Sequence, residues 1–289
     1  LFPLAWQATP TLAVGATLDF MWSGLDMRMA ASGAQLGGLV TGASGNLAAA
    51  LPALGGAPWA RVDFSNHNDF TGAAKSTGWG AKLGVVYKPA QAWTLGASYR
   101  FKSALSDMKT TASGASLSAT GGFADSGRMT VVDFQFPAMT ALGASWQVTP
   151  ELLLAADYKR IAWAAVMKDF RLRYDSAGMG GSVSFALPQN WKNQSVVNLG
   201  LAYAVNSQLT LRGGVNASDN PIPDALVNPL FPATVKRHYT LGAGWRFTPT
   251  DEINASLTLA PTSTVTNGMG VVVTHKQTNL QLMYSRHFL

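Results

Sequence analysis

Apolar and polar residues alternate along much of this chain. In the run that begins at Trp93, every second residue through Phe101 is apolar, and the residues between them are small or polar. Similar runs occur near 11–28, 78–87, 128–147, 152–173, 197–205, 208–217, 238–247, 252–265 and 271–288. A tilted strand crosses a bilayer in about 9–11 residues and turns alternate side chains to opposite faces. The pattern therefore predicts membrane-spanning strands with one apolar face.

The connections between these runs alternate in length. Short ones lie near 88–90, 149–151, 206–207 and 248–250, whereas long ones lie near 29–75, 104–127, 174–194 and 217–235, with a shorter one near 266–270. Short turns on one side and long loops on the other are typical of outer-membrane barrels, whose short turns face the periplasm. A soluble β-sandwich would also alternate, so the assignment depends on the asymmetry of the turns.

A tryptophan stands just before several of the short turns. The pattern Trp-x-x-Thr-Pro occurs at 6–10, 146–150 and 245–249. An indole ring suits a membrane surface, because its body lies in lipid while its N–H stays hydrated. Together the patterns predict an all-β protein: an antiparallel transmembrane β-barrel that crosses a Gram-negative outer membrane many times, with about 10–11 strands in this chain.

The composition agrees with such a barrel and excludes other classes. Charged residues make up only 12% of the chain, there are 29 glycines, and there is no cysteine, so neither a disulfide framework nor a thiolate site is available. The net charge of +6 is not gathered into a basic tract, which argues against nucleic-acid binding. No apolar stretch is long enough for a membrane helix, and no signal peptide is visible.

The strand count is odd at the start of the chain. Residues 1–6 run directly into a short turn and resemble the end of a strand, and about ten strands follow. Single-chain bacterial barrels have an even number of strands. We therefore expect this chain to be a partial barrel that lacks the first strands of the complete protein.

Several spaced motifs carry a resemblance to a known family. They lie at 187–194 (Leu-Pro-Gln-Asn-Trp-Lys-Asn-Gln), 199–203, 209–214, 220–223 (Asn-Pro-Ile-Pro), 231–232 and 238–244, with a further Phe-Pro at 136–137. Together they resemble the FadL family of outer-membrane channels for long-chain fatty acids and other hydrophobic compounds. The similarity extends from residue 11 to the end of the chain and is densest over 187–247.

The resemblance implies a fourteen-stranded barrel with an N-terminal plug domain, which this chain would lack. It also implies that cargo is caught in an apolar groove among extracellular loops, moves to a pocket in the lumen and leaves sideways through the wall. The expected function is diffusive uptake of long-chain fatty acids or aromatic hydrocarbons, without cofactor, metal or catalysis. We expect a monomer whose partners are these hydrophobic molecules, outer-membrane lipid and lipopolysaccharide.

Lys192, after Trp191, matches a family position where a lysine faces the lumen near bound fatty acid. An ammonium in an apolar pocket would hold a carboxylate strongly; alternatively, Lys192 is a loop lysine paired with an aspartate. The family's partner arginine is replaced by Gly24, although Arg28 lies nearby in the sequence. This departure favours a neutral hydrocarbon as cargo.

The loop at 31–57 predicts two short amphipathic helices. Its apolar residues recur at roughly helical spacing: Leu36, Leu39 and Val40, then Leu47, Leu51 and Leu54. Exposed apolar helices on an outer loop suggest an entry groove for apolar cargo. The alternative is that the two helices pack on each other and cap the barrel.

The polar sides of the strands carry many glycines and several charges. The glycines are Gly15, Gly84, Gly96, Gly143, Gly200, Gly214, Gly242 and Gly244, and the charges are Lys82, Arg100, Asp157, Lys159, Arg212 and Arg246. The glycines either leave room in the lumen or ease strand coiling. The charges either pair structurally or line a polar path.

Two rival functions are weaker. An outer-membrane lipase would need a nucleophile and a base near the outer rim, and Ser218 with His238 is the one pair that can be nominated. A structural or adhesive barrel would have a closed lumen without an apolar pocket. Basic residues near loop ends could meet lipopolysaccharide phosphates or be solvated loop charges: Lys102, Lys109, Lys168, Arg171, Arg173, Lys236 and Arg237.

Overall fold

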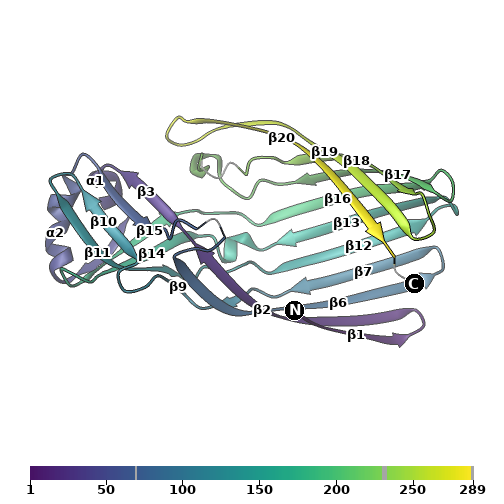
Figure 1. The fold of residues 1–289 in the computed structure, drawn as a ribbon, viewed down its shortest axis with the longest axis horizontal. Coiled ribbons are helices and arrows are strands. Elements are labelled where there is room, and N and C mark those ends of the chain that lie inside the picture. Colours follow the sequence, from purple (N-terminus) through teal and green to yellow (C-terminus); the bar gives the residue numbers. More distant parts are fainter. Residues whose placement is uncertain (69, 230–232, 288–289) are drawn as a thin grey trace.

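The protein forms a long wall of strands with a compact cap at one end (Figure 1). The computed structural model describes residues 1–68, 70–229 and 233–287. The alternation of short and long connections along the chain maps onto this shape, since the short turns gather at the right-hand end in Figure 1 and three of the long loops build the cap at the left. Among the described residues, no helix is long and apolar enough to cross a membrane.

Within the described residues, eleven antiparallel strands make the wall, in agreement with the predicted number. In order of pairing they are β1 (Phe2–Thr9), β2 (Leu12–Leu25), β6 (Ala74–Ala90), β7 (Trp93–Arg100), β12 (Met139–Gln147), β13 (Leu152–Ile161), β16 (Gln194–Ala204), β17 (Leu209–Ser218), β18 (Arg237–Arg246), β19 (Asp251–Thr266) and β20 (Val272–Arg286). Each strand is joined to the next by antiparallel hydrogen bonds. The predicted antiparallel barrel architecture is confirmed.

The register brings the apolar side chains of neighbouring strands to one face. Trp93 pairs with Trp146, and their rings stack with centroids 5.3 Å apart, while Leu201 and Gly213 continue the same cross-strand row two and three strands further along the wall. Leu241 is 69% exposed and Leu280 is 79% exposed, so protein does not cover this face. Apolar side chains in such number are stable on a surface only where lipid covers them.

Three of the long loops fold into a further set of paired strands, the cap. Its strands, in order of pairing, are β3 (Met27–Ala31), β5 (Ala60–Phe64), β10 (Ala115–Ala119), β11 (Phe123–Val132), β14 (Asp169–Ser176), β15 (Ser182–Pro188) and β4 (Val40–Ser44). Helices α1 (Gly33–Gly37) and α2 (Gly45–Gly55) lie against it, and β8 (Ala104–Leu105) and β9 (Met108–Lys109) pair with β6. The cap is continuous with the wall, because β9 pairs with both β6 and β11. Short 3₁₀ turns η1 (Trp163–Ala165) and η2 (Asp224–Leu226) complete the loops.

Several of the alternating runs do not form single strands. The run at 128–147 is divided into β11 of the cap and β12 of the wall, and the run at 152–173 is divided into β13 and β14. Asp133 adopts a positive φ of 50° between β11 and β12, and Pro137 follows it. Both features interrupt a ladder of hydrogen bonds. Alternation continues into the cap because protein, rather than lipid, buries one face of the sheet there.

The main buried core lies in the cap, not in the wall. Leu47, Phe64, Met129, Leu172 and Tyr174 are almost completely inaccessible to solvent and belong to one apolar cluster. The Tyr174 hydroxyl donates a 2.9 Å hydrogen bond to the buried Oδ2 of Asp125. Burial, together with this hydrogen bond, raises the pKa of the Tyr174 hydroxyl above its usual range. The phenol therefore stays protonated and acts as the donor.

Replacing Tyr174 with phenylalanine should destabilise the cap. The change leaves the buried Asp125 oxygen without its donor, and losing one partner of a buried hydrogen bond costs about 1–3 kcal/mol. Protease cleavage of the cap in the detergent-folded protein should accelerate accordingly. Tyr203→Phe, on the lipid-facing wall, is the matched control and should leave the cleavage rate unchanged. Equal rates for Y174F and the wild type would contradict a stabilising role for this bond.

Candidate functional site

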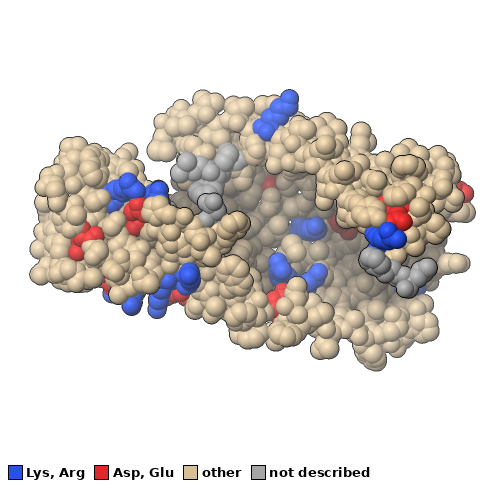
Figure 2. All heavy atoms as spheres, in the orientation of Figure 1, with Lys and Arg blue, Asp and Glu red and all other residues tan. Residues whose placement is uncertain are grey.

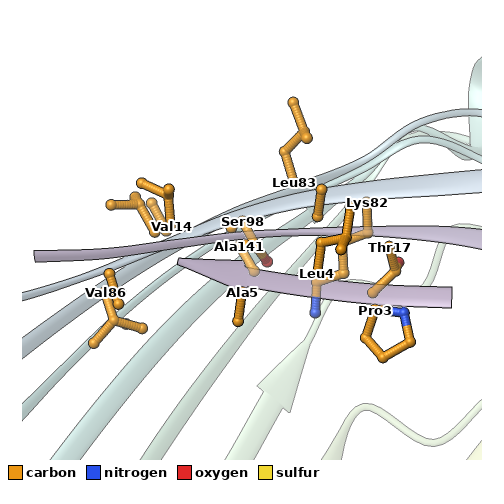
Figure 3. A pocket seen from close by; sticks show the side chains of 18 of the residues that line it. Pro3, Leu4, Ala5, Val14, Thr17, Lys82, Leu83, Val86, Ser98 and Ala141 are labelled. Atoms are coloured by element: carbon orange, nitrogen blue, oxygen red, sulfur yellow. The ribbon is translucent and has the colours of Figure 1, made fainter. Parts of the chain in front are cut away.

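A cavity of about 490 Å³ lies along the inner side of β1, β2, β6, β7, β12 and β13. Figure 2 shows the hollow of the molecule with both basic and acidic side chains inside it. In Figure 3, Val14 and Leu83 point to one side of the sheet, whereas Pro3, Ala5 and Val86 point to the other. The lining of the cavity as a whole is mainly apolar, and Thr17, Lys82 and Asp157 add polar groups to it.

Glycines keep the middle of this cavity open. Gly15, Gly84, Gly96 and Gly143 all line it, and the register places Gly15 beside Gly84 and Gly96 beside Gly143. An added Cβ at Gly84 or Gly96 would meet no atom closer than 3.7 Å. The backbone at these two positions would therefore accept a side chain. Such a side chain would extend into the space that the glycines leave open in the cavity.

Other lumen glycines accommodate charged neighbours. The Asp157 carboxylate lies over Gly143, so a Cβ there would collide with Oδ1 of Asp157. At Gly244, a Cβ would lie 2.6 Å from Nη1 of Arg212, which donates a 2.8 Å hydrogen bond to Oδ1 of Asn254. Strand coiling and an open lumen do not by themselves explain these two glycines. Each of them makes room for a charged side chain of the neighbouring strand.

A polar band lies nearer the long loops on the inner face. The Asn216 side-chain amide donates to Oδ1 of Asn198 at 2.6 Å, and Nδ1 of His238 lies 3.2 Å from Oδ1 of Asn216. The imidazole of His238 is thus engaged by an amide. Within the described ranges, no hydrogen bond joins His238 to Ser218, the nucleophile nominated for a lipase. The geometry does not assemble the pair that such a reaction would need.

A second apolar cavity, of about 430 Å³, lies in the cap. Leu36, Val40, Leu51 and Leu54 line it together with Phe185 and others from the cap sheet. The helix α1 starts with a capping box in which Ser32 and Gln35 satisfy each other's backbone N–H groups. The two helices contact each other and leave this cavity open beside them, and its use as an entry groove for cargo stays a prediction.

The other predicted groove residues take different places. Leu47, on the buried side of α2, is completely inaccessible and belongs to the cap core rather than to the cavity surface. Leu39 packs against the same core while partly exposed, and it is not among the residues that line the cavity. Val40 lies in β4 and not in a helix. Periodicity could not separate these roles, since a helix turns apolar residues both to a core and to a groove.

Trp191 and Lys192 lie in the connection just before β16 and line neither the lumen cavity nor the cap cavity. Trp191 packs edge to face on Trp163 with ring centroids 5.0 Å apart, and it contacts a small apolar cluster that includes Ile222 and Val265. Lys192 is exposed, and its backbone N–H donates to the Pro221 carbonyl at 2.8 Å. In the described part of the chain, no carboxylate lies within ion-pair distance of its ammonium.

Arg28, the possible substitute for the partner arginine, belongs to the cap. It lies in β3 of the cap, where its Nε is 3.6 Å from Oδ2 of Asp63 and its Nη2 donates to Ser65. The structure instead places Lys82 and Asp157, of opposite charge, along the lumen cavity. The sequence shows that Lys82 and Asp157 lie on the inner faces of their strands, among glycines. It does not show that they line the same cavity, because this depends on the order of the strands in the wall.

Similarity to known proteins agrees with this architecture. The family described as outer membrane protein transport protein (OMPP1/FadL/TodX) matches residues 2–284. The solved structure of the P. putida toluene transporter TodX is 31% identical with a TM-score of 0.80, and the match covers 99% of this chain and 68% of that one. For the Ralstonia pickettii toluene transporter TbuX the identity is 28%, the TM-score 0.77 and the coverage 99% and 66%. Outer membrane protein P1 of Haemophilus influenzae is 28% identical over 177 residues, which are 61% of this chain and 36% of that protein.

A lipid-facing antiparallel wall, short turns on one side and a capped, partly apolar lumen define an outer-membrane β-barrel. The chain belongs to the OMPP1/FadL/TodX family of outer membrane transport proteins. Its match spans about a third of the length of the curated relative from H. influenzae. The predicted family and the outer-membrane location are confirmed.

Proposed function

We propose that this protein is a channel for the diffusive uptake of hydrophobic small molecules across the outer membrane. The observation that carries the proposal is the 490 Å³ lumen cavity, whose lining is mainly apolar and includes Pro3, Ala5 and Val86. A polar solute would lose hydration there without gaining partners. An apolar solute would gain roughly 0.8 kcal/mol for each buried CH₂.

Monoaromatic hydrocarbons are the cargo that the cavity supports best. Lys82 and Asp157 both line it, so opposite charges face the same space and give a carboxylate no net attraction. The relatives TodX and TbuX are toluene transporters. The cap cavity, lined by Leu36, Val40 and Leu51, would be the first site that the cargo meets.

Long-chain fatty acids are the second candidate, and Lys192 is the residue that favours them. Its ammonium is exposed beside Trp191 and the apolar cluster of the outer loops. A fatty acid could place its carboxylate on Lys192 and its chain on that cluster. In this case the selectivity would be set at the rim rather than in the lumen.

Uptake by whole cells tests both candidates. A strain lacking the gene should take up radiolabelled toluene several times more slowly than the same strain with the gene restored, and unchanged uptake of both toluene and oleate would overturn the channel. Lys192→Ala should lower oleate binding and spare toluene if the lysine holds a carboxylate. An equal effect on the two compounds would remove that role.

We also propose that the cargo passes unchanged and that a single chain is the working unit. Support comes from His238, which is engaged by Asn216 rather than by a serine, and from relatives that are transporters. The plug domain and the fourteen-stranded wall stay predictions from the family. Of the arginines among the basic loop residues, Arg171 and Arg173 pair with Asp133 and Asp175 in the cap. Arg237 has no such ion pair among the described residues, and it is the arginine that we favour for lipopolysaccharide, together with the loop lysines.

A further inference from the structure

The lipid-facing side of the wall has a depression of about 730 Å³. Small residues form its floor: Ala144 on β12, Ala156 on β13 and Gly213 on β17. Larger side chains around them include Trp146, Leu199 and Tyr239. Almost all of the surface is apolar. Because the register places Ala144 beside Ala156, the small residues are neighbours across the strands rather than isolated gaps.

The depression runs obliquely from one membrane rim towards the other. At one end, the stacked Trp93 and Trp146 rings stand next to the short turns. At the other end lies Tyr239, the third residue of β18, which begins at a long loop. The strands cross the bilayer at a tilt, so one depression can follow a chain over most of the hydrocarbon thickness.

Two arginines stand on the same face beyond the upper end. Arg237 is two residues before Tyr239 on β18, and Arg160 is four residues beyond Ala156 on β13. Two residues along a strand return to the same face, and each residue advances about 3.3 Å. Arg160 Nη1 donates to the Ser195 hydroxyl at 2.8 Å, and the Tyr158 hydroxyl lies 3.3 Å from the same atom.

Neither guanidinium is neutralised by the protein. Both arginines are exposed, and among the residues that the structure describes no carboxylate lies within 4.0 Å of either one. The cap arginines differ, since Arg171 and Arg173 each pair with an aspartate. Unpaired arginines above an apolar surface suit a ligand that carries both phosphate and hydrocarbon, because guanidinium groups bind phosphate oxygens in a bidentate way.

We propose that this face is a binding site for the phosphorylated glycolipid of the outer leaflet, with lipid A as its core. One acyl chain lies in the depression over Ala144, Ala156 and Gly213, and the phosphates meet Arg160 and Arg237. A zwitterionic phospholipid could fill the depression but would not compensate two separated cations. The inference depends on the outer-membrane location and is independent of which cargo crosses the lumen.

Native mass spectrometry of the detergent-purified protein tests the site with lipid A and, separately, phosphatidylethanolamine. The double variant Arg160→Ala/Arg237→Ala should weaken lipid A binding by about tenfold or more, since hydrogen bonds to charged groups are strong. The control Arg171→Ala/Arg173→Ala, which removes paired arginines from the cap, should stay within about twofold of the wild type.

A second variant tests the hydrocarbon part of the site. A Cβ at Gly213 would lie 3.8 Å from Leu201 and 3.9 Å from Leu241, so Gly213→Leu fits the wall and fills the depression. It should weaken both lipids, whereas the arginine variant should weaken lipid A alone. Wild-type lipid A binding by the arginine variant, or equal retention of phosphatidylethanolamine and lipid A by the wild type, would overturn the proposal.

Discussion

Toluene uptake should fall roughly 10- to 100-fold when Gly84 is replaced by leucine. The glycine faces the 490 Å³ lumen cavity, and an added Cβ would meet the Ala97 carbonyl at 3.7 Å and Ser98 at 3.8 Å, which are ordinary contacts. The strand therefore keeps its geometry while the side chain fills the path. Forcing cargo past added methylenes costs about 1–3 kcal/mol, and each 1.4 kcal/mol slows passage about tenfold.

The matched control for this variant is Gly42→Leu. Gly42 lies in β4 of the cap, and a Cβ there would have no atom within 4 Å. Both variants should migrate as folded barrels on unheated gels, so that a loss of uptake reports on the lumen alone. Wild-type uptake by a folded Gly84→Leu protein would show that cargo does not pass through this cavity.

The second large effect is expected at the cap. Leu51→Asp replaces an apolar wall of the 430 Å³ cavity with a charge and should raise the half-saturating toluene concentration about tenfold. The maximal rate should change little, since the lumen is untouched. A raised half-saturating concentration with an unchanged maximal rate identifies a site that captures cargo, whereas a barrier to passage would lower the maximal rate.

Ala49→Asp provides the control for that change. It introduces the same charge in the same helix, but Ala49 is exposed and does not line the cavity. Its half-saturating concentration should match that of the wild type. If both variants behaved alike, the effect would belong to charge on the cap surface and the cavity would have no role in capture.

Much of the wall could be predicted from the sequence, for a physical reason. Lipid on one side and the lumen on the other impose a period of two on every strand, as the residues from Trp93 to Phe101 illustrate, and short turns mark one rim. The cap could not be recovered in this way. Its strands β11 and β14 show the same alternation as the wall, but they are paired with each other and bury their apolar face in protein.

The candidate sites also contain a part that the sequence predicts and a part that depends on how distant segments pair. The loop leucines indicated a pair of helices and a groove, and Leu36 and Leu51 do line a cavity, whereas Leu47 is core. The lumen cavity was hidden because its lining comes from six strands far apart in the sequence. Lumen glycines were visible as a set, but only the cross-strand register shows that Gly143 makes room for Asp157 while Gly84 does not serve a neighbour in this way.

The interleaved pairing of the cap limits how relatives can exchange parts. The segment between β2 and β6 supplies β5, which pairs with β10 of the next segment, and β11 of that segment pairs with β14 of the third. The third segment then returns through β15 to β4 of the first. A chimera that borrows one segment alone would leave mismatched edges on both sides. Natural or engineered recombination should therefore transplant all three segments as a unit.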